Sequence, residues 1–192
     1  MAKQLIAMKT LISTIMILTI SSASVVGADD PAISVAIVVP RDGGHGERRV
    51  TYRNSGTEWD RAAHFHAIVS NRSEKPQRIW QEGCSWGYFA LSFEFTDEAG
   101  KKWEAKKGMT PFVMNRPAYW SLEPSESTVL EVYFADPDIW KDFPRPDNGS
   151  KVVVSMRAIF EIRSTPESTK HDVWTGRVVS EARRITFHRP KK

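Results

Sequence analysis

The sequence predicts an all-β protein: an antiparallel immunoglobulin-like sandwich of about seven to nine strands behind an N-terminal leader. Beyond the leader, apolar side chains recur at every second position, the period of a strand that covers a core with one face. Pro, Gly, Asn and Asp separate these segments, and no amphipathic stretch of helical length interrupts them except a short turn near 138–142. Because parallel strands need crossover helices, an antiparallel arrangement follows.

Residues 1–28 are expected to form a cleaved signal peptide. Lys3 and Lys9 precede the apolar run Leu11–Ile20, and small residues then lead to Ala28. An uncleaved membrane anchor is the alternative, although several Ser and Thr interrupt the apolar stretch. We therefore expect a single domain, 29–192, in the periplasm or outside the cell, which contacts a membrane only if the leader is retained.

The expected strands follow one another along the mature chain. Alternation marks the segments 33–39, 64–70, 89–96, 129–134 and 152–163. The turn Asp97–Gly100 leads from the third of these into a partner strand around Trp103. The longest segment places six apolar side chains on one face: Val152, Val154, Met156, Ala158, Phe160 and Ile162. Three long loops remain, 41–47, 107–117 and 135–150, and loops of this kind often carry function.

Two motifs resemble exported bacterial immunoglobulin-like modules. The run from Phe65 through Asn71 to Pro76 resembles their signature of a strand, an Asn, polar residues and a Pro. The segment Leu122–Glu126 resembles their Leu-x-Pro-Gly-Glu turn, with Ser125 in place of the glycine. The layout is also distantly similar to the intracellular proteinase inhibitor domain of bacilli. The resemblance implies a fold and carries over no functional residue, protease inhibition included.

Composition and charge argue against nucleic acid as a partner. The full chain of 192 residues has 27 basic and 23 acidic side chains, a formal charge of +4, and two of the basic residues lie in the leader. The mature domain is thus close to neutral, without basic residues interleaved among aromatic ones. We expect the basic C-terminal end to be a solvated tail; its charged residues are Arg183, Arg184, His188, Arg189, Lys191 and Lys192.

Familiar catalytic motifs are missing from the sequence, so we expect no enzyme and no cofactor. There is no Gly-x-Ser-x-Gly, no His-Glu-x-x-His, no Cys-x-x-Cys and no phosphate-binding loop. The single cysteine, Cys84, is expected to be a buried, small apolar group. The favoured function is a non-catalytic binding or structural module with a protein or glycan partner.

Aromatic side chains outside the regular strands are the first candidate site. Trp86 and Tyr88 lie in a turn-like stretch, and Trp140 and Phe143 lie in a loop. Exposed rings can anchor a protein partner or stack on a sugar, so these four residues predict a binding surface. The simpler interpretation of the tryptophans is that large rings fill the ends of the sandwich core. A carbohydrate-binding module is one form of this hypothesis.

His64 and His66 are the second candidate site. Side chains two residues apart on a strand share a face, so both imidazoles could reach one copper or zinc ion. The other histidines, His45, His171 and His188, have no spacing that nominates them as further ligands. A metal-binding protein is therefore the alternative function, and two histidines on an ordinary sheet face is the simpler interpretation.

Overall fold

The structure is a computed structural model that describes residues 31–39, 49–51, 64–112, 115–134 and 139–191. The predicted leader 1–28 and the loop 41–47 lie outside the described residues. The rest is mostly β, which confirms the predicted class. The elements are β1 (Ile33–Val38), β2 (Arg49–Thr51), β3 (His64–Asn71), β4 (Gln77–Trp80), α1 (Ser85–Tyr88), β5 (Leu91–Asp97), β6 (Lys102–Lys107), β7 (Tyr119–Leu122), β8 (Ser127–Tyr133), β9 (Trp140–Lys141), β10 (Lys151–Ile162), α2 (Pro166–Lys170), β11 (Gly176–Val179) and β12 (Arg183–His188).

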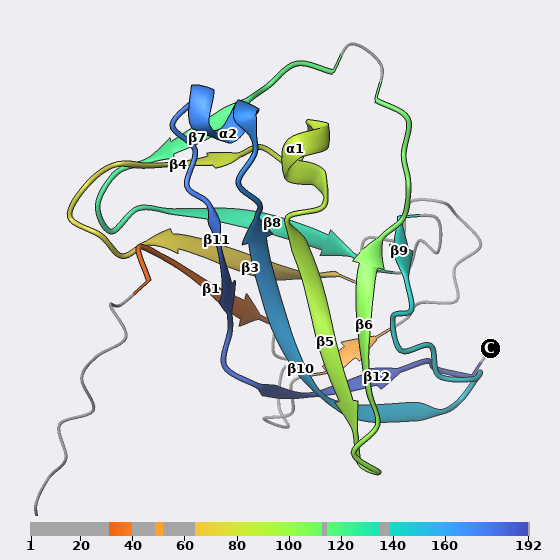
Figure 1. Cartoon of the computed structure of the whole chain (residues 1–192). Helices are drawn as coiled ribbons and strands as arrows, with labels where there is room; N and C mark the ends of the chain where they lie inside the picture. The colour runs from red at the N-terminus through yellow and green to blue at the C-terminus, as the bar shows by residue number, and fades with distance from the viewer. Residues whose placement is uncertain (1–30, 40–48, 52–63, 113–114, 135–138, 192) are drawn as a thin grey trace, which may run out of the picture.

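The described strands form three sheets. The largest has the order β2-β12-β10-β5-β6-β9, with β11 paired to β10. A three-stranded sheet has the order β1-β3-β8, and β4 pairs with β7 in a two-stranded ribbon. All these pairs are antiparallel except the short pair of β12 with β2. In Figure 1 the large sheet stands in front of β1, β3 and β8, and the β4–β7 ribbon crosses above with both helices.

One hydrophobic core fills the space between the large sheet and the three-stranded sheet. Phe65 of β3 meets Phe93 of β5 edge to face, with ring centroids 5.2 Å apart. The alternation predicted for the longest segment is confirmed, because Val154, Met156 and Ala158 on β10 are buried. Burial of a side chain as large as Val154 or Met156 stabilises the fold by roughly 1.5–3 kcal/mol.

Asn71 joins the three-stranded sheet to the β4–β7 ribbon. Its side chain is 0% exposed. The amide Nδ2 donates to the carbonyl oxygens of Leu122 and Lys75, each at 2.8 Å. Oδ1 accepts from the backbone N–H of Ser73 at 2.9 Å and from its hydroxyl at 2.8 Å. The two resembling motifs thus meet at one corner, where Ser125 has the left-handed φ of 67° that favours glycine.

Several sequence-based expectations need correction. The described residues hold twelve strands rather than seven to nine, because the short strands carry too few residues to show alternation. Trp140–Lys141 forms β9 instead of a helical turn. Phe89 precedes β5 instead of beginning it, since the one-turn helix α1 ends beside it. Arg183–His188 is not a solvated tail: it forms β12, because its apolar face, Ile185 and Phe187, belongs to the core.

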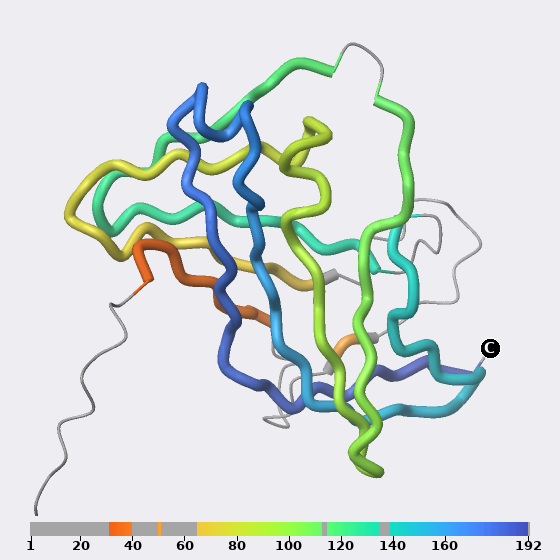
Figure 2. Tube along the Cα trace, in the orientation of Figure 1, coloured from red at the N-terminus to blue at the C-terminus, as the bar shows by residue number. Residues whose placement is uncertain are grey.

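Other expectations hold. Gly100 closes the Asp97–Gly100 hairpin with φ 84° and donates its N–H to the Asp97 carbonyl at 3.0 Å. Figure 2 shows this hairpin at the lower end of the molecule, opposite both helices. Cys84 is buried and free. Among the described residues, no helix is long and apolar enough to cross a membrane.

Candidate ligand-binding groove

The helix α1 is a single turn of four residues, and neighbouring segments contact it on both sides of its first turn. Its N-cap, Cys84, has extended dihedrals and makes no side-chain cap. Asn115 takes over this role: its Oδ1 accepts from the Ser85 N–H at 3.0 Å, and its Nδ2 donates to the Ser85 hydroxyl at 2.6 Å. A Cβ added to Gly87 would lie 2.2 Å from the Gln81 carbonyl oxygen. The helix is therefore pressed against the chain that leaves β4.

This position of α1 presents aromatic rings at the upper end of the large sheet. Trp86 is half-buried and packs on Trp80, with ring centroids 5.9 Å apart. Trp80 is 2% exposed, so the Trp86 ring packs on a buried support. Phe89, directly after α1, is 45% exposed. An exposed ring of this size on a rigid support is a feature of binding surfaces.

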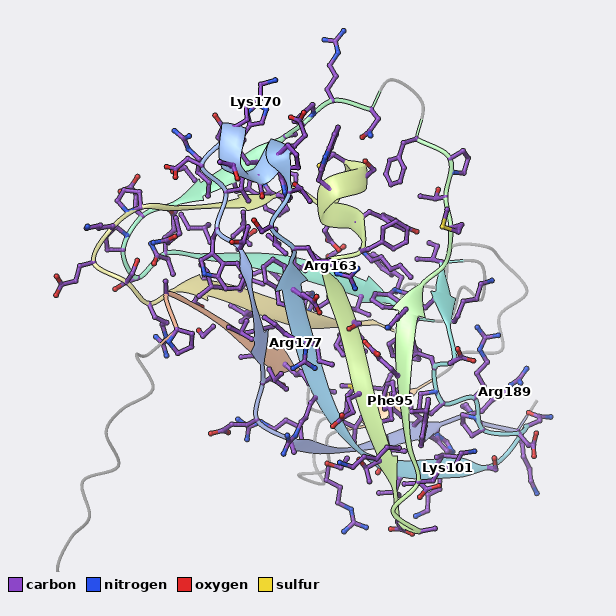
Figure 3. All side chains as sticks on the ribbon, viewed as in Figure 1. Phe95, Lys101, Arg163, Lys170, Arg177 and Arg189 are labelled. Carbon is purple, nitrogen blue, oxygen red and sulfur yellow. The ribbon has the colours of Figure 1, made fainter. Side chains whose placement is uncertain are left out.

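A groove of about 420 Å³ opens beside these rings, and we name it the α1 groove. Its apolar lining consists of Trp80, Trp86, Phe89, Ala90, Leu91 and Ile162. Its polar lining includes Ser92, Glu104, Lys106, Lys107, Glu161 and Arg163. In Figure 3, Arg163 lies at the upper end of β10 next to α1, and Arg177 lies on the neighbouring β11. The volume falls in the range of small-molecule sites.

The charged side chains of the groove form ion pairs with one another and with neighbouring residues. Lys106 Nζ lies 2.9 Å from Glu104, which also accepts from the Ser92 hydroxyl at 2.8 Å. Partial burial raises the pKa of Glu104, but hydrogen bonds from Lys106 and Ser92 and the positive charges of Lys106 and Arg177 outweigh it and leave that pKa below its ordinary value. Glu161 lies 3.2 Å from Arg163 and 3.8 Å from Arg177. Both carboxylates therefore have cations within ion-pair distance.

Lys107 connects the groove to the elements beneath it. Its side chain is only 8% exposed, and its Nζ lies 2.5 Å from Glu82. The same ammonium stands 4.8 Å from the centre of the Tyr88 ring and 5.5 Å from that of Trp140. Cation–π contacts of a desolvated ammonium are worth up to about 2 kcal/mol. Lys107 thus ties β6, α1 and β9 into one support.

The four predicted aromatic site residues separate into two groups. Trp86 lines the α1 groove, and Tyr88 adjoins it through Lys107. Trp140 is 1% exposed and Phe143 4% exposed, so the prediction of exposed loop rings is wrong for both. The cause is tertiary: β9 pairs with β6 and carries the following residues inward, where Phe143 lies 5.3 Å from the Phe95 ring.

The predicted histidine pair lies on β3, in the three-stranded sheet rather than in the large sheet that carries the groove. His66 is half-buried, with Nε2 4.0 Å from Glu131 across the strand pair. The backbone of His64 pairs with Tyr133, and its side chain lies outside the described residues. In the part of the chain that the structure describes, no group of three or more His, Cys, Asp and Glu side chains is placed to hold a metal. Metal binding stays a prediction, which metal analysis of the His64→Ala, His66→Ala variant tests.

Most groove residues were not predicted from the sequence. The alternation in the sequence places Phe89 on a strand face, whereas Glu104 and Lys106 are ordinary polar residues of β6 and Arg163 directly follows β10. No spacing in the sequence nominates them, because the groove brings together the segments 80–92, 104–107 and 161–165. A second hollow of about 470 Å³ lies lower on β6, but its rings turn inward: Trp103 stacks on Phe95 at 5.4 Å. The α1 groove is the better candidate because it contains an exposed ring, Phe89, beside the half-buried Trp86.

A scan against models of known protein families finds no match, and a search of curated proteins finds no relative. The fold and the groove define the class: an all-β protein with a ligand-sized groove at one end of its large sheet. Inference about function therefore rests on the groove's own residues.

Proposed function

We propose that this protein is an exported, non-catalytic binding module, an immunoglobulin-like sandwich whose ligand site is the α1 groove. The leader pattern of 1–28 supports export to the periplasm or the exterior. Two sheets that share one core support the sandwich. The observation that carries the proposal is that half-buried Trp86 and exposed Phe89 line one groove together with ion-paired polar groups.

Rigidity supports binding. The Trp86 ring rests on buried Trp80, and the backbone of α1 is held by Gly87 and Asn115. A ligand that enters such a site does not have to order it first, and this preorganisation improves affinity.

The lowered pKa of Glu104 makes this residue a poor general acid or base, which favours binding over proton transfer by Glu104. A general acid or base works best when its pKa lies near the working pH. The pKa of Glu104 is shifted the other way, below its ordinary value, by Lys106 and Ser92. Glu161 is held by two arginines. Charges fixed in this way suit the recognition of polar ligand groups.

Fragment mapping by NMR tests the location of the site without assuming a ligand. The mature chain, 29–192, labelled with ¹⁵N, is titrated with small aromatic and polyol fragments. We expect shifts of the amides of Ala90–Ser92, Lys106–Lys107 and Glu161–Arg163, and we expect Trp86→Phe to reduce them. Shifts that cluster elsewhere, for example on β8, or no shift at fragment solubility, would contradict the proposal.

A further inference from the structure

We infer that the α1 groove binds a neutral oligosaccharide, a chain of uncharged pyranose units; this inference rests on the proposed function. The class follows from three features of the groove: its rings, its charge pairs and its strand pairing.

The rings provide an apolar surface for a flat, partly apolar ligand. Phe89 is 45% exposed, and Trp86 lines the same groove from the preceding turn. A pyranose ring has apolar C–H faces and a rim of hydroxyls. Its faces can pack on aromatic rings while its rim stays polar, which matches a groove that has both kinds of lining.

The charges that line the groove are nearly balanced, which suits a ligand without net charge. The three lining cations each have a carboxylate within reach: Lys106 with Glu104, Lys107 with Glu82, and Arg163 with Glu161. An anionic ligand would have to compete with these carboxylates, and a cationic ligand with the cations. The groove therefore offers no strong advantage to either sign.

The same pairs suit hydroxyl groups. An ammonium has three donors, a guanidinium five, and a carboxylate about four acceptor sites, so one ion pair leaves much of this capacity unused. A hydroxyl donates and accepts at once, so it can bridge the two members of a pair such as Glu161 and Arg163. Bonds of this kind to charged groups are stronger than bonds between neutral groups.

Strand pairing argues against an extended peptide. Peptides commonly add a strand to an open sheet edge. At the groove, β5 lies between β10 and β6, and β10 lies between β5 and β11. The end of β6, Lys106–Lys107, is paired with β9. Of the described strands that line the groove, β5 and β10 offer no open edge, whereas β4, which contributes Trp80, pairs only with β7. A ligand that lies over β5 and β10 must therefore be recognised by side chains.

Calorimetry with hexasaccharides tests the inference. The mature chain is titrated with neutral hexamers of β-1,4-linked glucose, N-acetylglucosamine, xylose and mannose. We expect at least one to bind, and we expect an affinity that changes less than about twofold between about 0.1 M and 1 M NaCl. Phe89→Ala, a surface change, should weaken binding about fivefold to tenfold. Val129→Ala, at a side chain 56% exposed on β8, is the matched control and should leave it unchanged.

Three results would overturn the inference: no binding of any neutral hexamer at millimolar concentration, binding that Phe89→Ala and Trp86→Phe leave unchanged, or salt-sensitive binding of polygalacturonate alone. Fragment mapping distinguishes a wrong ligand class from a wrong binding site. If fragments occupy the α1 groove but no neutral hexamer binds, the ligand class is wrong and the site stands. If fragments avoid the groove, the proposed function fails as well.

Discussion

Replacing Asn71 with Ala should lower the free energy of unfolding more than the substitution of any exposed asparagine does. The side chain is 0% exposed and forms four hydrogen bonds, to Leu122, Lys75 and twice to Ser73. Each hydrogen bond contributes about 1 kcal/mol net, so the loss of all four would cost about 4 kcal/mol of unfolding free energy. Water can replace some of the bonds to the partly buried partners, so we expect a loss of about 3–4 kcal/mol. The bond to Leu122 matters most, because that carbonyl is buried.

Urea unfolding of the mature chain, followed by tryptophan fluorescence, measures the effect. With a slope of about 2 kcal/mol per M, the midpoint should fall by about 1.5–2 M urea. Asn115→Ala is the control: it also removes two hydrogen bonds, but exposed ones to Ser85, and should cost about 1 kcal/mol or less.

A second variant separates hydrogen bonding from packing. Asn71→Asp keeps the shape and the acceptor but loses both Nδ2 donations and buries a charge beside two carbonyl oxygens. We expect it to be at least as unstable as Asn71→Ala at pH 7 and to recover in part in acid, where the carboxyl is protonated and donates one bond. If Asn71→Ala lies within about 1 kcal/mol of the parent protein, the corner does not hold the two sheets together and the reasoning is refuted.

Four further predictions concern other parts of the chain. Gly87→Ala should destabilise the fold by about 1–3 kcal/mol in urea and abolish fragment shifts, because its Cβ would clash with the Gln81 carbonyl; unchanged shifts would contradict this. Ser125→Gly should raise stability by about 0.5–1 kcal/mol in urea, since φ 67° is strained for serine; a loss would show that the serine is favoured. The folded-state pKa of Glu104 lies below its ordinary 4.5, so ionised Glu104 stabilises the fold above that pH, and this stabilisation is lost as pH falls through the lowered pKa. Glu104→Gln should therefore make the free energy of unfolding depend less on pH in acid; an unchanged dependence would contradict this. Mass spectrometry of the protein from its host should find an N-terminus at Asp29, whereas an intact N-terminal segment would favour the anchor.

The sequence predicted the large elements because their burial follows a local rule. Along β10, every second side chain from Val154 to Ile162 is buried, and period two is visible in the letters alone. The Asp97–Gly100 hairpin was equally local, since a Gly with positive φ closes it. The short strands β9 and β11 were missed because two to four residues cannot show a period.

The candidate site was only partly predictable, because exposure of a ring depends on what packs over it. Trp86 and Trp140 both lie outside the long alternating strands in the sequence, yet one lines the α1 groove and the other is 1% exposed. The difference arises from the pairing of β9 with β6, which joins residues far apart in the chain. Likewise, Lys107 and Glu82 form an ion pair although α1 and β5 separate them in the sequence, and no spacing in the sequence predicts this contact.

The most direct test of the central claim follows the Trp86 ring itself. Mature protein labelled with 5-fluorotryptophan gives one ¹⁹F signal for each tryptophan, and Trp86→Phe identifies the signal of Trp86. We predict that the fragments used for mapping shift this signal and leave that of buried Trp140 in place. If the Trp86 signal stays fixed while another tryptophan responds, the α1 groove is not the ligand site.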